Sequence, residues 1–286
     1  MKFLWVTTLI WSFSFTLIGK YLSGKVDSYY AVAIRFWLAL LVLLPFVKLR
    51  RELTQLYLKI ALVGAVQVGL MYIFFYRSFL YMPVPLVILS TSFTPLYIGL
   101  FESWKTRKSS LAQLGAIGLA IFGALIVRWS VPPERWDYWT GFALVQGANL
   151  CFGIGQVWYR EITASSFPKG HRDIDSFVWF YVGAVLVITP IAILFGNAQK
   201  MLLESAQLLT LLWLGVVASG GGYLLWNRGT REVSGHTLAI MNNLVVPLGV
   251  IVSLLWGANI QNNLNFYFGS GLIGLSLYLN LRGEKH

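Results

Sequence analysis

The chain has 286 residues, of which 57% are hydrophobic and only 12% are charged, whereas about a quarter of the residues of a soluble domain carry charge. Its mean hydropathy of +0.68 therefore indicates that lipid surrounds most of the chain. The net charge of +11 is typical of basic cytoplasmic loops in a membrane protein, so we expect no nucleic-acid partner. The single cysteine, Cys151, excludes an intrachain disulfide. We find no metal-ligand spacing, catalytic constellation or phosphate-binding loop, so we expect no cofactor and no enzymatic activity.

Ten apolar runs, joined by short loops, follow one another along the chain. A helix needs about 20 apolar residues to cross the hydrocarbon core of a bilayer, and the pattern predicts an all-α integral membrane protein. The expected membrane helices cover residues 3–20, 29–47, 58–77, 83–103, 110–128, 138–159, 176–196, 207–227, 237–256 and 265–281. No small-residue cleavage site follows the first run, so we expect it to be a membrane helix rather than a signal peptide.

The basic residues predict the orientation of these helices. Of the 22 lysines and arginines, 15 fall on one side of the predicted bundle, which holds both termini and the loops after the second, fourth, sixth and eighth runs. Six fall on the opposite side, and Arg35 lies inside the second run. Because cytoplasmic loops carry the excess of positive charge, we expect both termini to lie in the cytoplasm.

One unit occurs twice in the chain. The stretches "YIFFYRSFLYMPVPLVILSTSFTPLYIG" and "YLLWNRGTREVSGHTLAIMNNLVVPLG" share a tyrosine, an arginine after an apolar run, and a later proline. The matched residues, 151 or 152 positions apart, are Tyr72 and Tyr223, Arg77 and Arg228, and Pro95 and Pro247.

This repeat predicts two five-helix halves, residues 1–130 and 131–286. Because five is odd, the second half enters the membrane from the other side, and the two halves must be inverted. Inverted repeats recur in secondary transporters, which hold their substrate between the halves near the midplane.

Amide and hydroxyl side chains predict where the cavity lies. In lipid such groups are costly unless they pair or face a wet cavity. The runs 110–128 and 265–281 nearly lack them and are rich in small residues, so we expect these two at the periphery. The expected polar lining comprises Gln67, Ser90, Thr91, Gln146, Asn149, Asn242 and Asn243. Trp11, Phe15 and Tyr72 are candidates to enclose a flat ligand, with packing against neighbouring helices as the alternative.

Arg35 is the candidate anion-binding residue. It lies about six positions into its run, roughly 9 Å deep, and a charge at this depth usually marks a pathway. Its planar guanidinium suits a carboxylate, and the alternative is that it snorkels to the outer headgroups. Arg77 is a second candidate; it lies nearer the boundary, where simple interfacial anchoring is the stronger alternative. All acidic residues fall in loops or at segment ends, so we expect no proton relay at midplane depth.

Four residues are candidate hinges: Pro95, Pro247, Gly220 and Gly221. Prolines at matched places in both halves, and the glycines of "ASGGGY", interrupt helical hydrogen bonds or loosen packing. The alternative is a kink that neighbouring helices tolerate.

The motifs "TPLYIGL" (94–100) and "YLLWNRG" (223–229), in ten segments of two inverted fives, resemble the EamA type of the drug/metabolite transporter superfamily. The stretches "VDSYYAVAIR", "GNAQKM", "GVVASGGGYLLWNRG" and "TLAIMNN" are similar to its carboxylate/amino acid/amine branch and, within it, to members that transport biotin.

This resemblance implies a secondary transporter of the bacterial inner membrane that takes up a small organic solute by alternating access. Biotin is the first expectation, and another small carboxylate or amino acid is the next. Export of amino acids or amines is the alternative function, and a membrane-embedded lipid enzyme is a remote one. The expected partners are this solute and the lipid bilayer, and the oligomeric state stays open.

Overall fold

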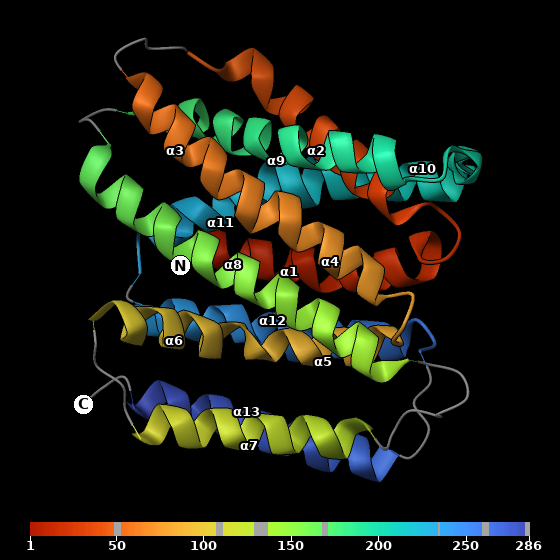
Figure 1. Cartoon of the computed structure of the whole chain (residues 1–286), viewed down its shortest axis with the longest axis vertical. Helices are drawn as coiled ribbons and strands as arrows, with labels where there is room; N and C mark the ends of the chain where they lie inside the picture. Colours follow the sequence, from red (N-terminus) through yellow and green to blue (C-terminus); the bar gives the residue numbers. More distant parts are fainter. Residues whose placement is uncertain are drawn as a thin grey trace.

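The computed structural model describes residues 1–48, 53–106, 111–128, 137–167, 171–233, 235–258 and 263–283. Within these ranges all regular secondary structure is helical, and each of the ten expected segments corresponds to one helical run (Figure 1). The all-helical fold is therefore confirmed for the described part of the chain.

The runs are α1 (Lys2–Leu17) with η1 (Ile18–Leu22); α2 (Ser28–Leu43) with η2 (Leu44–Phe46); α3 (Thr54–Gly64), η4 (Ala65–Leu70) and α4 (Met71–Ser78); α5 (Val84–Ser90), η5 (Thr91–Phe93) and α6 (Thr94–Thr106); α7 (Leu111–Arg128); α8 (Tyr138–Ser166); α9 (Asp173–Phe195); α10 (Ser205–Leu212), η7 (Trp213–Gly221) and α11 (Gly222–Thr230); α12 (Gly235–Leu255); and α13 (Asn263–Gly283). A short turn, η6 (Ala198–Met201), precedes α10. The segments η1, η4 and η7 are π-helical, while η2, η5 and η6 are 3₁₀ turns.

Apolar side chains cover the outside of the bundle as well as its core. On α9, Leu194 is 73% exposed and Phe195 is 68% exposed, which in water would be an aggregation hazard. In the described part of the chain five runs are long and apolar enough to cross a membrane: Lys2–Leu22, Ser28–Phe46, Thr54–Ser78, Asp173–Phe195 and Ser205–Thr230. The apolar stretches Val84–Ile98, Gly118–Val127 and Leu244–Leu255 are shorter. The chain is thus a multi-pass helical membrane protein.

Acidic residues start helices in this fold. The Asp27 carboxylate accepts hydrogen bonds from the backbone amides of Tyr29 and Tyr30, each at 3.0 Å, at the start of α2. Asp137 does the same for α8 by accepting from Thr140, whose hydroxyl and amide lower the pKa of this carboxyl. Capping satisfies orphan N–H groups of the first turn, which explains why these carboxylates lie at segment ends rather than deep in the bundle.

The helix contacts fall into two equivalent sets. α1 packs against α11 and α12, while α8 packs against α4 and α6. Likewise α2 packs against η7, while α9 packs against α3 and η4. The remaining major pairs, α2 with α9, α5 with α12 and α7 with α13, each join a run to the run five places later. Two equivalent halves, made of the first five runs and the last five, would give this pattern of contacts.

The α7–α13 pair forms one end of the molecule (Figure 1). Glycines bring its two backbones together, since a Cβ added at Gly123 would lie 2.8 Å from the carbonyl oxygen of Gly269. It contacts α6 and η5, and the Tyr138 hydroxyl of α8 donates to the Ala124 carbonyl of α7 at 3.0 Å. The pair is therefore peripheral, in the position expected from its lack of polar side chains.

The α3–α9 contact is also made by glycine. A Cβ on Gly64 would collide with the carbonyl oxygen of Phe180, and a Cβ on Gly183 would collide with that of Ala61. The two backbones touch at this point, and no flexible side chain is present there to move aside.

We predict that Gly64→Ala or Gly183→Ala destabilises the protein by about 1–3 kcal/mol, the usual cost of overpacking. The measurement is thermal unfolding of the purified protein in detergent. Gly274→Ala is the matched control, because nothing lies within 4 Å of a Cβ at that position. Equal melting temperatures for Gly64→Ala and Gly274→Ala would contradict the proposed backbone contact.

Candidate functional site

The site begins with the π-helical segment η7. A wider helical turn leaves backbone carbonyls without regular helical partners, and side chains from other helices supply hydrogen bonds here. Trp11 Nε1 donates to the Ala218 carbonyl at 2.9 Å, and the Tyr181 hydroxyl donates to the Ser219 carbonyl at 2.7 Å. η7 is thereby held between α1 and α9, with the Ser219 side chain directed to the bundle interior.

Arg35 of α2 lies at the centre of the bundle and is 0% exposed. Its Nε donates to Ser219 Oγ at 2.7 Å, its Nη1 to the Tyr76 hydroxyl at 3.2 Å, and its Nη2 to the Tyr72 hydroxyl at 3.0 Å. The guanidinium carbon also lies 4.3 Å from the centroid of the Tyr72 ring. Tyr223 donates to the Tyr72 hydroxyl at 3.2 Å. Arg35 is therefore anchored inside the bundle, and the snorkelling alternative is wrong.

Neutral groups supply the partners of this cation. No described acidic side chain bonds to Arg35, and a buried charge without a counter-charge is costly. Three hydroxyls and a ring face offset part of that cost. The guanidinium has five N–H groups and also borders a cavity, so it presents positive charge to whatever enters there.

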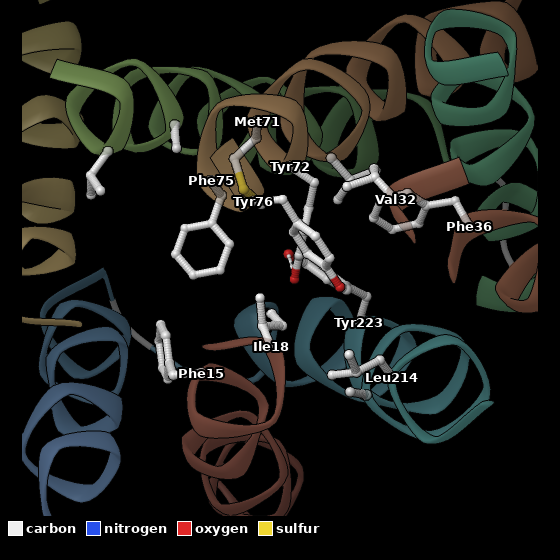
Figure 2. Packing of buried hydrophobic residues seen from close by; sticks show 14 of the residues in the cluster. Phe15, Ile18, Val32, Phe36, Met71, Tyr72, Phe75, Tyr76, Leu214 and Tyr223 are labelled. Atoms are coloured by element: carbon white, nitrogen blue, oxygen red, sulfur yellow. Dashed lines mark hydrogen bonds between the residues drawn. The ribbon is translucent and has the colours of Figure 1, made fainter. Parts of the chain in front are cut away.

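The cavity lies between α1, α2, α4, η5, α6, α8, α11 and α12, has a volume of about 100 Å³ and is partly open to the outside. In Figure 2 the side chains of Phe15, Ile18, Phe75 and Tyr223 converge around it. The expected residues that line it are Trp11, Phe15, Arg35, Tyr72, Thr91, Asn149 and Asn242. The structure adds Ser14, Ile18, Met71, Phe75, Thr94 and Tyr223, among others. Neither α7 nor α13 contributes a described residue to the lining.

A second polar part of the wall surrounds Asn149. Its Nδ2 donates to the Ser90 carbonyl at 2.8 Å and to Gln146 Oε1 at 3.1 Å, while its Oδ1 accepts from Thr94 Oγ1 at 3.0 Å. The 3₁₀ turn η5 interrupts the helix immediately after Ser90, which frees that carbonyl from regular α-helical pairing. The wall thus combines a cationic region at Arg35 with a neutral amide region at Asn149.

Several expected residues lie outside the lining. Gln67 is fully buried one helical turn before the lining residue Met71. Gln146 accepts a hydrogen bond from Asn149, and Ser90 contributes its backbone carbonyl to this network. Arg77 packs over the ring of Tyr29 and lies 3.5 Å from the Tyr81 hydroxyl. The side chain of Asn243 lies outside the described part of the structure.

The hinge candidates differ in their surroundings. Gly220 and Gly221 lie in η7. Pro95 is the second residue of α6, directly after η5, where its missing N–H falls in a first turn that needs no helical acceptor. Pro247 instead lies inside a continuous α12. Only the first of the two matched prolines therefore follows an interruption of its helix.

The lining residues that the sequence analysis missed have recognisable signals. Phe75 lies one helical turn after both Met71 and Tyr72, and Ile18 lies one turn after Phe15. Tyr223 is the repeat counterpart of Tyr72. Helical spacing together with the 151-residue repeat identifies these positions once the first lining residues are known.

A multi-pass helical bundle that encloses a polar and aromatic cavity around a buried cation has the architecture of a solute carrier. Residues 2–129 match the model of the EamA-like transporter family. The chain is 42% identical over 255 residues to a protein named biotin transporter from Escherichia coli K12, covering 89% of this chain and 84% of that one. It is 38% identical over 285 residues to a probable biotin transporter of Pseudomonas aeruginosa, covering 100% and 99%.

A solved crystal structure with 13% sequence identity shares the fold, with a TM-score of 0.67 over 99% of this chain and 96% of that one. The chain therefore belongs to the EamA-like family of drug/metabolite transporters.

We predict that Tyr72→Phe destabilises the protein more than Tyr223→Phe. Tyr72→Phe removes the acceptor of both Arg35 and Tyr223, and a hydrogen bond to a charged group contributes about 1.5–3 kcal/mol. Tyr223→Phe removes one neutral bond of about 1 kcal/mol. The measurement is thermal unfolding in detergent, with Tyr267→Phe as the control because Tyr267 is 60% exposed. Equal losses at Tyr72 and Tyr223 would contradict the assigned hydrogen bonds.

Proposed function

We propose that this chain is a secondary transporter that takes up biotin across the bacterial inner membrane by alternating access. The observation that carries this proposal is the cavity beside Arg35, which has a buried cation without an acidic partner among the described residues. The similarity to biotin transporters over most of the chain supports the choice of solute.

The chemistry of the cavity wall suits biotin. Its carboxylate matches the guanidinium of Arg35, which is planar and binds carboxylates in a two-pronged manner. Its ureido group needs both donors and acceptors: Asn242 keeps a second N–H beside the one it gives to Gln156, and the carbonyl oxygen of Asn149 can accept a second hydrogen bond. Its fused rings need apolar contact, which Phe15 and Phe75 provide. A few placed polar groups in a mainly apolar pocket are the usual composition of a small-molecule site.

The proposed motion is a rocking of residues 1–130 against residues 131–286 as inverted halves. The two equivalent sets of helix contacts support this arrangement. Two glycines 151 positions apart also have equivalent roles. Gly64 lies against the backbone of Phe180, and Gly215 lies against the backbone of Arg35, where a Cβ would be 2.9 Å from the Arg35 carbonyl oxygen.

The proposed orientation places both termini in the cytoplasm. The distribution of lysine and arginine supports it, and α1 begins at the same end of the bundle at which α13 ends (Figure 1). Uptake then carries the solute from the opposite side toward the end where α1 begins.

We predict that Arg35→Ala weakens biotin binding about 10- to 150-fold, because a charge-assisted hydrogen bond contributes about 1.5–3 kcal/mol. Arg35→Lys recovers only part of the loss, since an ammonium cannot form the two-pronged contact. The measurement is calorimetric binding of biotin and of biotin amide to purified protein. Wild type binds the amide poorly, whereas Arg35→Ala discriminates little between acid and amide.

The matched control for this prediction is Arg228→Ala, because Arg228 has a 58% exposed side chain and is not among the lining residues. A folded Arg35→Ala protein that binds biotin with wild-type affinity would make Arg35 a structural anchor. The anion site would then have to be sought at Arg77 or in the amide region around Asn149.

We predict saturable counterflow in proteoliposomes. Vesicles loaded with unlabelled biotin accumulate labelled biotin transiently, because a carrier exchanges solute across its alternating states, whereas a channel does not. The measurement is the time course of labelled biotin, with empty vesicles as the control. Counterflow with amino acids and none with biotin would contradict the proposed solute and favour the amino-acid exporter.

A further inference from the structure

A second layer of polar side chains lies directly beneath the cavity. On four of the runs that line the cavity, the next helical turn toward the end where α1 begins carries buried polar residues. They are Thr8 on α1, Gln67 on η4, Gln156 on α8, and Trp226 and Asn227 on α11. Each is at most 2% exposed. Each also has at least one nitrogen or oxygen atom with no hydrogen-bond partner among the described residues.

Direct contacts join this layer to the cavity floor. Asn242, which lines the cavity, donates to Gln156 Oε1 at 3.2 Å. Trp226 packs on the cavity-lining Trp11, with ring centroids 5.0 Å apart, and it also contacts Leu4 and Met241. On the other side of the bundle, Gly155 lies so close to Gln67 that a Cβ there would overlap the glutamine side chain.

The polar side chains of this layer destabilise the conformation seen here, because several of their atoms are buried without a hydrogen-bond partner among the described residues. Both polar atoms of the Gln67 carboxamide lack a partner in the described part of the chain, and an unsatisfied buried amide costs more than an apolar side chain of the same shape. Packing alone therefore does not account for these residues. Hydrogen bonds to a solute, made in another conformation, do account for them, because the layer lies one helical turn beyond the cavity lining.

We propose that Thr8, Gln67, Gln156 and Asn227 form a second solute-binding station, which opens when α8 separates from η4 at the Gly155–Gln67 contact. The inference rests on the proposed function. The station presents amides and a hydroxyl and contains no charged side chain, so it suits a neutral group with both donors and acceptors. A cyclic urea or a carboxamide has this chemistry. The solute's polar head passes through the station after it leaves Arg35, toward the end where α1 begins.

Gln67→Met tests the station, because it removes the amide and nearly preserves the shape. We expect the initial rate of biotin uptake into proteoliposomes to fall about fivefold, the effect of losing one hydrogen bond of about 1 kcal/mol. Calorimetric affinity for biotin stays within about twofold of wild type, because Gln67 does not line the cavity, and the melting temperature does not fall. Gln199→Met is the control, since Gln199 is exposed. Undiminished uptake by Gln67→Met, or a loss explained by unfolding, would overturn the station.

Thiol labelling provides an independent measurement on a Cys151→Ser background. Thr8→Cys should react with a membrane-impermeant thiol reagent added from the side where α1 begins, and saturating biotin should slow the reaction. Thr16→Cys is the matched control, two turns along α1 and also buried, and it should not react from that side. If the wild-type protein takes up no biotin, the proposed function is wrong, and the labelling then tests the station by itself. Reaction of Thr8→Cys would show that the layer is open to one side in some conformation, and no reaction would exclude the station.

Discussion

The burial of the Arg35 guanidinium is the constraint around which the centre of this bundle is arranged. Moving a cation out of water costs several kcal/mol even after relaxation, so the fold must supply compensating groups. They come from separate parts of the chain: Ser219 from η7, and Tyr72 and Tyr76 from α4. Two consecutive runs and one far along the chain therefore meet at one side chain. If any of these runs were shifted, a buried N–H group of the guanidinium would lose its hydrogen-bond partner.

Glycine and π-helical geometry make this meeting possible. Gly215 lets η7 approach the backbone of α2 beside Arg35, and the wide turn directs Ser219 Oγ to the guanidinium while Tyr181 satisfies the Ser219 carbonyl. Gly64 allows a similar approach of α3 to α9, where it meets the backbone of Phe180. The same kind of glycine contact therefore occurs at both places, and an arginine lies at only one of them.

The sequence predicts some features of this structure well and others poorly, for physical reasons. Hydropathy locates the helical runs, because bilayer thickness fixes their length, and the scarcity of polar side chains identifies α7 and α13 as peripheral. The depth of Arg35 predicts its interior position. The orientation of Gln67 is not predictable in this way, because it lies in η4, where each π turn shifts the helical phase of the residues around it. The hydroxyl partners of Arg35 are also hidden from sequence, since they depend on how the helices are rotated against one another.

Neutral partners suit Arg35 better than an acid if the cavity receives an anion. A buried carboxylate beside Arg35 would cancel its charge and leave nothing to attract a solute carboxylate. Hydroxyls and a ring face offset desolvation without removing the charge. Two opposite charges 4 Å apart attract by about 4 kcal/mol at an effective dielectric constant of 20, and that attraction stays available to the solute. The empty site therefore retains part of the desolvation cost of its cation, and a bound carboxylate relieves it. This difference between the empty and loaded states gives the cavity a preference for anions that hydrogen bonding alone would not provide.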